Sequence, residues 1–356
     1  MDTGSTPPTP PLAPLPAAPP AMYWPPPPPP RRTLWRGLLS ALLLVVPFLL
    51  VLYLLGSVFG TLTGGDAGVL LEEHHSLARL APHKIAIVSI EGAILDGEGF
   101  AKRQIDAIRE DDAVRAVVLR IDSPGGSVTA SDYIYHHLRK LADEKKIPFV
   151  VSMGGMAASG GYYIAMAAGD TPDIIFAEPT TWTGSIGVII PHYNVAGLMQ
   201  RLEVEEDSIK SHPLKQMGSP TRKMTDEERQ LFQELVDDAF GRFKEIIYSG
   251  RARFREHPEE LDALATGQVF TTSQALENGL VDRQGFIEEA IDRAIELAQL
   301  DRKDVEVIQY QRPFSLFDGL LLGESEAPPP SAELKALLDL TTPRAYYLCT
   351  WLPSGL

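Results

Sequence analysis

The chain has 356 residues, of which 44% are hydrophobic and 22% are charged, and this composition suits one or two globular domains. Its net charge of −15 argues against general nucleic-acid binding, and its single cysteine, Cys349, excludes an intrachain disulfide and a cysteine-rich zinc site. Because the sequence has no Walker, HExxH or dinucleotide-binding pattern and its histidines lack ligand spacing, we expect neither a metal nor a cofactor.

The N-terminal segment combines a proline-rich tail with a long apolar stretch. Fourteen of the 30 prolines lie in the first 30 residues, so we expect residues 1–36 to form a disordered tail. Residues 38–59 are apolar and uncharged over a length that spans a bilayer, which predicts a transmembrane helix within 37–60. A cleaved signal peptide, the alternative, has a shorter apolar region of roughly 7 to 15 residues.

The charges that flank this apolar stretch predict its orientation. Arg31, Arg32 and Arg36 precede it, whereas Asp66 follows it, so the positive-inside rule places the tail in the cytoplasm. We therefore expect a single-pass protein of the cytoplasmic (inner) membrane whose remaining chain is extracytoplasmic. A flexible stalk is predicted over residues 61–83.

An α/β domain is predicted over residues 84–323. Short β-branched runs predict strands at 84–90, 116–121, 149–153, 173–177, 185–190 and 305–310. Helical spacing predicts helices at 98–110, 128–146, 157–168, 225–250, 272–278 and 284–299. Thr225 followed by Asp-Glu-Glu is typical of a capping box at the start of the longest of these helices. Strands that alternate with helices favour a parallel sheet with crossover helices.

Residues 324–356 are predicted to be a linker and a C-terminal tail. The tail is predicted to contain an amphipathic helix, which the apolar segment YYLCTWL follows. Docking on the domain or on a neighbouring chain is the simpler interpretation of this segment, and contact with a membrane is the alternative.

Two glycine-rich turns at predicted strand ends carry candidate catalytic groups. The turn Asp-Ser-Pro-Gly-Gly at 122–126 has adjacent glycines, whose exposed backbone N–H groups can hold an oxyanion. The small residues around Ser159 can present that serine at the start of a helix, where N–H groups favour a developing negative charge. Each turn alone is also explained by close packing.

A nucleophilic serine needs a base, which is either a histidine with a carboxylate or a neutral lysine. Lys215 lies among apolar neighbours in the sequence, where desolvation favours the neutral amine that a base requires. The alternative interpretation of Lys215 is a solvated loop residue.

Four segments in order resemble one family of proteases. The segments DSPGG, SMGGMAASGGYY, TGSIGVI and IKSxxxKxMGSPxRxMTxEER are similar to those of the signal peptide peptidase family of SppA type, in its short, single-repeat form. The resemblance covers about residues 84–310. It implies the ClpP/crotonase-like α/β fold, a spiral of β-β-α units.

The resemblance also implies roles for individual residues. Ser159 and Lys215 would be the nucleophile and general base of a Ser/Lys dyad, with oxyanion N–H groups at Gly126 and Gly160. Ser185 would orient the lysine, although a serine in a strand turn has a simpler structural explanation.

One position departs from the family pattern. His212 stands where the family commonly has glycine, and it leaves open a base that depends on histidine instead of lysine.

The implied function is that of a membrane-anchored serine endopeptidase and homo-oligomer that hydrolyses apolar, extended peptides such as signal-peptide remnants. An apolar groove with a small pocket would then select Ala, Leu and similar residues. Two alternatives remain open. A crotonase-like acyl-CoA enzyme would share the fold without needing both Ser159 and Lys215, and a catalytically silent membrane scaffold would be indifferent to replacement of either.

Overall fold

The computed structural model describes residues 70–311 and 345–349. The expected proline-rich tail, transmembrane helix and linker lie outside these residues, as do residues 61–69 of the expected stalk. Within the two described ranges, no helix has the length and apolar content needed to cross a membrane.

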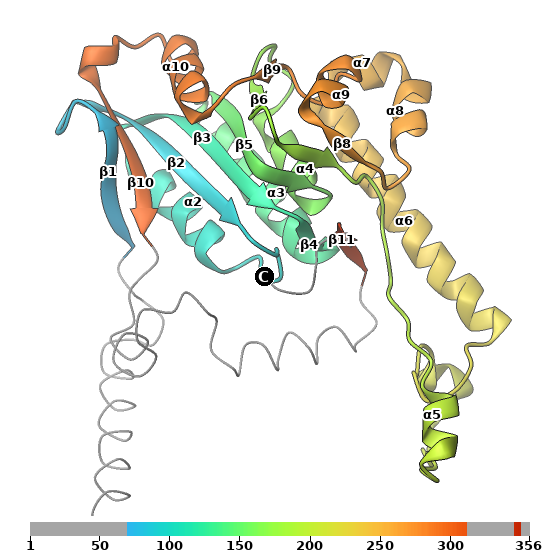
Figure 1. Ribbon diagram of the computed structural model, residues 1–356. Helices are drawn as coiled ribbons and strands as arrows, with labels where there is room; N and C mark the ends of the chain where they lie inside the picture. Colours follow the sequence, from blue (N-terminus) through green and yellow to red (C-terminus); the bar gives the residue numbers. More distant parts are fainter. Residues whose placement is uncertain (1–69, 312–344, 350–356) are drawn as a thin grey trace, which may run out of the picture. The chain divides into compact units, whose positions relative to one another are not determined.

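The described residues form a mixed α/β fold around a nine-stranded sheet (Figure 1). The strand order is β1-β10-β2-β3-β5-β6-β9, and β7 pairs with both β5 and β8. The strands from β10 to β9 run parallel, whereas β1 and β8 pair antiparallel with their neighbours. These strands are β1 (Leu71–Leu77), β2 (His83–Glu91), β3 (Val114–Ser123), β5 (Phe149–Ala158), β6 (Ile175–Ala177), β7 (Trp182–Gly184), β8 (Val269–Thr271), β9 (Arg283–Gln284) and β10 (Val305–Gln311).

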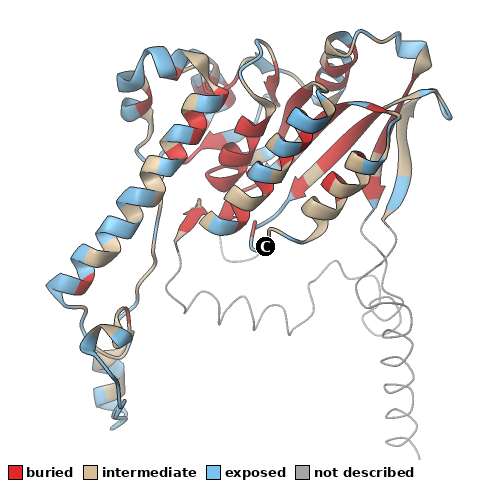
Figure 2. Ribbon diagram, turned by 180° about the vertical axis from the view of Figure 1, so that it is seen from behind, coloured by how far each residue is buried: buried red, intermediate tan, exposed pale blue. Residues whose placement is uncertain are grey.

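The central strands are buried because helices cover both faces of the sheet. The runs 85–88, 117–119 and 150–151 consist mostly of β-branched residues and are almost completely inaccessible to solvent, as expected of parallel strands (Figure 2). Right-handed crossovers place α2 (Phe100–Glu110), α3 (Val128–Lys145) and α4 (Gly160–Ala165) on one face. Helix α10 (Ile287–Leu297) packs on β3 and β5 from the other face.

The remaining elements complete the body and form an arm. A 3₁₀ turn (Met166–Ala168) extends α4, and the long helix α6 (Asp226–Gly250) leads to α7 (Ala252–Glu256), α8 (Pro258–Leu264) and α9 (Thr272–Glu277). The arm contains α5 (Ala196–Arg201) and a 3₁₀ turn (Pro213–Gln216), and it lies at the N-terminal end of α6, away from the sheet (Figures 1 and 2). A further 3₁₀ turn (Arg302–Asp304) precedes β10.

A second, two-stranded sheet lies beside the large one. It pairs β4 (Gly125–Ser127) antiparallel with β11 (Tyr346–Leu348). The docking predicted for the C-terminal tail is therefore found for residues 345–349, on the domain itself.

Most of the predicted strands and helices are confirmed, including the capping box in which Thr225 and Glu228 exchange hydrogen bonds. Three predictions need correction. The strand expected at 185–190 is found at Trp182–Gly184 instead, because the Ser185 backbone turns into the left-handed region at φ 50°. Residues 157–158, expected to begin a helix, still belong to β5. The described part of the expected stalk forms β1, which is held by its ladder with β10.

A buried ion pair fastens the C-terminal end of α6 to the sheet. Arg251 Nη1 lies 2.6 Å from Asp282 Oδ1, and both side chains are less than 15% exposed. Asp282 Oδ2 also accepts the backbone N–H groups of Ile174 and Ile175 at 3.0 and 2.9 Å.

Replacement of this carboxylate is expected to destabilise the fold. Asp282→Asn leaves the Arg251 charge buried without its counterion, which should lower the free energy of unfolding by about 3 kcal/mol. The control is Asp292→Asn, which removes an ion pair with Arg302 whose two side chains are both more than half exposed and should change stability by less than about 0.5 kcal/mol. Urea unfolding of the two variants measures both values, and equal effects would contradict the prediction.

Candidate active site

Ser159 lies at a sharp turn between the end of β5 and the start of α4. Its backbone adopts φ 53° and ψ −113°, a conformation that is strained for any residue except glycine. The turn is held because the Ser159 N–H donates to Gly184 O at 2.7 Å and the Ser159 carbonyl accepts the Tyr163 N–H at 2.9 Å. The side chain is 1% exposed, and Oγ has no hydrogen-bond partner among the described residues. A buried hydroxyl without a partner is costly, so this group is available to a base or a ligand.

The two predicted oxyanion groups lie next to each other at this turn. A Cβ atom placed on Gly160 would lie 3.2 Å from the backbone nitrogen of Gly126. The opposite edge of β4 is occupied, because Ile94 donates to Gly125 O at 2.9 Å and accepts from Ser127 N–H at 2.8 Å. Since amide directions alternate along a strand, the Gly126 N–H points away from Ile94.

Two further serines support this arrangement. Ser123 Oγ donates to Gly92 O at 2.6 Å and accepts the Gly125 N–H at 3.0 Å, which fixes the glycine turn. Ser131 Oγ, from α3, is buried, has no hydrogen-bond partner among the described residues, and would lie 2.5 Å from a Cβ atom on Gly160. Ser123 belongs to the DSPGG segment that the sequence singled out, whereas nothing in the sequence around Ser131 signals its position.

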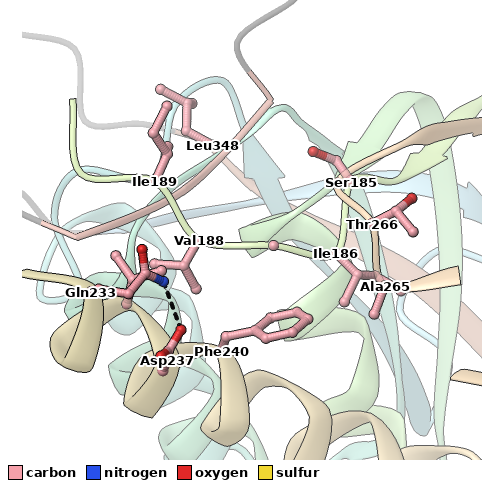
Figure 3. Close-up of a pocket in the computed structure, with 13 residues that line it drawn as sticks. Ser185, Ile186, Val188, Ile189, Gln233, Asp237, Phe240, Ala265, Thr266 and Leu348 are labelled. Atoms are coloured by element: carbon pink, nitrogen blue, oxygen red, sulfur yellow. Dashed lines mark hydrogen bonds between the residues drawn. The ribbon is translucent and has the colours of Figure 1, made fainter. Parts of the chain in front are cut away.

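Ser185 follows β7, one residue after the carbonyl that holds the Ser159 turn. It is 6% exposed, and its N–H donates to Gln268 O at 2.7 Å. Figure 3 shows that Ser185 lines a cavity of about 370 Å³, together with Phe240 and Leu348. Ser159 does not line this cavity, but Ser185 links the two because the neighbouring Gly184 carbonyl accepts the Ser159 N–H. The cavity is large enough to admit a side chain from elsewhere. Within the described part of the chain, no group of three or more His, Cys, Asp or Glu residues is arranged to hold a metal ion.

Lys215 is not brought to this site within one chain. It lies on the 3₁₀ turn of the arm, its side chain is exposed, and the arm projects from the body at the far end of α6 (Figures 1 and 2). His212 lies on the same turn and uses Nδ1 to accept the Leu214 N–H at 3.2 Å. The single chain therefore brings together Ser159 and the two glycine N–H groups, and it holds both candidate bases in the arm.

A charged cluster fixes the turn that carries Lys215. Arg222 donates to both carboxylate oxygens of Glu228, at 2.9 Å for Oε2, and to Gln216 O at 3.0 Å. These hydrogen bonds from Arg222 lower the pKa of Glu228 to about 2. The position of the Lys215 turn thus depends on an ionised carboxylate at the start of α6.

A strained serine between a strand and a helix, flanked by glycine N–H groups on a parallel α/β sheet, defines a serine hydrolase of the ClpP-like class. Comparison with known families agrees with this class. Residues 141–301 match the model of peptidase family S49, and residues 87–182 match that of Clp protease.

Known proteins similar to this chain are named as proteases. A putative protease of Synechocystis is 40% identical over 243 residues, which cover 68% of this chain and 84% of that protein. A putative signal peptide peptidase SppA of Enterococcus faecium is 37% identical over 68% of this chain and 72% of its own length. Protease 4 of Salmonella typhi is 38% identical over 63% of this chain and 36% of its own length. The chain belongs to peptidase family S49 and is a serine peptidase.

The glycine turn is expected to tolerate no side chain. A Cβ atom on Gly126 would lie 1.9 Å from Ile94 O, so Gly126→Ala must displace β4 and should lower kcat/KM for a peptide by about 100-fold or more. The control is Gly241→Ala in α6, where a Cβ atom meets nothing within 4 Å. This substitution should stabilise the helix by about 0.5–1 kcal/mol. Full activity of Gly126→Ala would contradict this account of the turn.

The Glu228 carboxylate is expected to make stability depend on pH in the acid range. Its pKa is about 2 in the folded chain, against 4.5 ordinarily, so its contribution is fully present above about pH 4.5 and is lost as the pH falls toward 2. Glu228→Gln should make the thermal unfolding midpoint less dependent on pH over this range. Glu234→Gln, which changes an exposed residue of the same helix, should leave the pH dependence as it is. Identical pH profiles for the two variants would contradict the prediction.

Proposed function

We propose that this peptidase is a membrane-anchored endopeptidase with a Ser/Lys dyad that hydrolyses apolar, extended peptides such as signal-peptide remnants. The observation that carries the proposal is the Ser159 turn, where a buried hydroxyl with no hydrogen-bond partner in the described part of the chain lies beside the N–H groups of Gly126 and Gly160. The names of the SppA relatives support this substrate class.

The proposed reaction has two stages, acylation of Ser159 and hydrolysis of the acyl-enzyme. The neutral Lys215 amine takes the Ser159 proton, Oγ attacks the peptide carbonyl carbon, and the two glycine N–H groups stabilise the oxyanion. The lysine then gives its proton to the leaving amine as the peptide bond breaks. Water, deprotonated by the same lysine, then attacks the acyl-enzyme carbonyl carbon. The ester bond to Oγ breaks, the lysine returns the proton to Ser159 Oγ, and the acid product leaves.

We further propose that Lys215 reaches Ser159 of a neighbouring copy in a homo-oligomer. The arm carries Lys215 away from its own body, and the cavity beside Ser185 leaves room for a lysine that arrives from outside. Exposed apolar residues of the arm support an interface there, because Leu198, Leu202 and Ile209 are each more than half exposed. Ser185 would orient the incoming amine.

The proposed location follows from the sequence of the N-terminal segment. The apolar stretch 38–59 would anchor the chain in the cytoplasmic membrane, with Arg31, Arg32 and Arg36 on the cytoplasmic side. The domain that carries Ser159 would then act outside the cytoplasm, near the membrane surface.

Mixing of two inactive variants tests the dyad and its geometry. Ser159→Ala and Lys215→Ala should each abolish hydrolysis of a fluorogenic apolar peptide when purified alone. Co-expressed in equal amounts, they should regain about a quarter of wild-type activity, because an intact serine then meets an intact lysine at one site in four.

The controls separate the alternatives. Co-expression of Ser159→Ala with wild type should lower peptide hydrolysis in proportion to the fraction of chains that lack Ser159. His212→Ala should keep its hydrolytic activity. A mixture without activity would place the dyad within one chain, and active Lys215→Ala with inactive His212→Ala would move the base to the histidine. Activity that survives Ser159→Ala would overturn the proposed nucleophile, and no peptide hydrolysis by wild type would favour the scaffold alternative.

A further inference from the structure

Helix α6 carries a carboxylate on the face that lines the cavity beside Ser185. Residues three and four positions apart share one face of a helix, and on this face they are Gln233, Val236, Asp237 and Phe240. A helix face that packs toward the body of a protein is normally apolar. The charge of Asp237 at this position therefore requires an explanation.

Asp237 is the one charged side chain among the described residues that line this cavity. The other contributing segments, which are residues 185–189, residues 265–267 and Leu348, have no titratable side chain. Figure 3 shows Asp237 and Ser185 on opposite sides of the cavity. An amine that enters between them would therefore experience the field of a single carboxylate.

The charged groups around Asp237 lie outside this cavity. Glu234 and Asp238 are exposed residues of the same helix, and Arg229 and His192 line the adjoining cavity along α6. None of these four residues lines the cavity beside Ser185. Asp237 is therefore its dominant charge.

Asp237 has no cationic partner within the described residues. Its Oδ1 atom accepts the Gln233 Nε2 group at 2.8 Å. Lys244, two turns further along the same helix, pairs with Asp262 at 3.1 Å instead. Because a carboxylate that is covered without a cation is costly, a segment that closes the cavity needs to bring a positive charge.

Lys215 is the matching charge in the arm. Its side chain is exposed and takes part in no ion pair between described residues. Its charged and titratable neighbours in the arm have other partners, which are Gln216 for Lys210 and Glu206, Glu228 for Arg222, and the Leu214 N–H for His212. Lys215 is therefore the cation of this turn that a neighbouring cavity can receive.

The two charges do not meet within one chain. The Arg222–Glu228 cluster fixes the Lys215 turn at the start of α6. Asp237 lies nine residues beyond Glu228 on this helix, which corresponds to about 14 Å at the rise of an α-helix. The four-carbon stem of a lysine is too short for this distance. The cation that enters the cavity therefore has to come from a second copy.

We propose that Asp237 is a positioning residue that attracts the Lys215 amine of a neighbouring copy into the cavity lined by Ser185. The inference rests on the proposed function, in which Lys215 is the base, and it specifies where the arm of the neighbour docks. An amine that leaves water for an apolar cavity pays a desolvation cost, which the carboxylate offsets in part. The same carboxylate favours the charged amine, so it moves the onset of activity toward higher pH.

The pH dependence of peptide hydrolysis tests this role. Asp237→Asn should move the pH of half-maximal kcat/KM for a fluorogenic apolar peptide toward acid by about half a unit, because the ammonium form loses its counterion. Added salt should bring the wild-type profile closer to that of the variant, since salt screens the attraction. The KM for the peptide should stay as in the wild type.

The matched control is Asp238→Asn, which removes the same charge from the next residue of the helix, outside the cavity. It should move the profile by less than half as much as Asp237→Asn does. Equal shifts in the two variants would make this an effect of net charge and would overturn the proposal, as would an unchanged profile of Asp237→Asn. A higher KM with an unchanged profile would make Asp237 a contact of the substrate, and would overturn it too.

Cross-linking locates the arm without catalysis. In the full chain with Cys349→Ala, Lys215→Cys and Asp237→Cys should be joined by a short bismaleimide into covalent multimers, since the two side chains together span more than a disulfide does. Lys215→Cys with Asp238→Cys, the control, should give several-fold fewer multimers. Equal yields from the two pairs, a link within one chain, or no link would each contradict the proposed docking.

The inference and the proposed function fail in different ways. Activity that survives Lys215→Ala would refute the proposed base. Inactive Lys215→Ala together with a wild-type pH profile of Asp237→Asn would refute the role of Asp237 and leave the peptidase proposal intact. A selective link between positions 215 and 237 of different copies, in a protein that hydrolyses no peptide, would support the docking and refute the proposed chemistry.

Discussion

The close approach of three backbone segments around Ser159 is the constraint on which the site depends. The parallel register of β3 and β5, which pairs Ser123 with Ala157, brings two strand ends to the same edge of the sheet. A side chain at Gly126 would overlap the backbone of Ile94, so glycine is required there, and a side chain at Gly160 would force Ser131 Oγ to move. The buried sheet supplies the rigidity that keeps the strained serine between them.

The location of Lys215 is set by the arm and not by the sheet. The arm leaves the body before α5 and returns through α6, so Lys215 is held by the Arg222–Glu228 cluster and not by the sheet. Within the described residues, a single chain therefore presents a serine whose Oγ has no hydrogen-bond partner and a lysine that faces solvent. If Lys215 serves a neighbouring copy, as we propose, assembly would complete the catalytic site and an isolated subunit would be inactive.

The β4 edge is paired with the C-terminal strand β11. The N–H groups that stabilise an oxyanion belong to a strand edge, and any extended segment of suitable register satisfies them. Tyr347 does so here, with its ring between those of Tyr163 and Phe243.

The sequence by itself determined the alternation of buried strands and helices, the Thr225 capping box and the two glycine turns, because these depend on neighbouring residues. It also indicated Ser159, Gly126 and Gly160, whose position follows from the order of the strands. It misplaced the strand near Ser185, where a left-handed turn interrupts an apolar run. Only the tertiary structure decided that Lys215 lies away from Ser159 and that Tyr347 donates to Ala239 O, 108 residues away. Contacts of this kind depend on how whole elements pack, and no local pattern of residues encodes them.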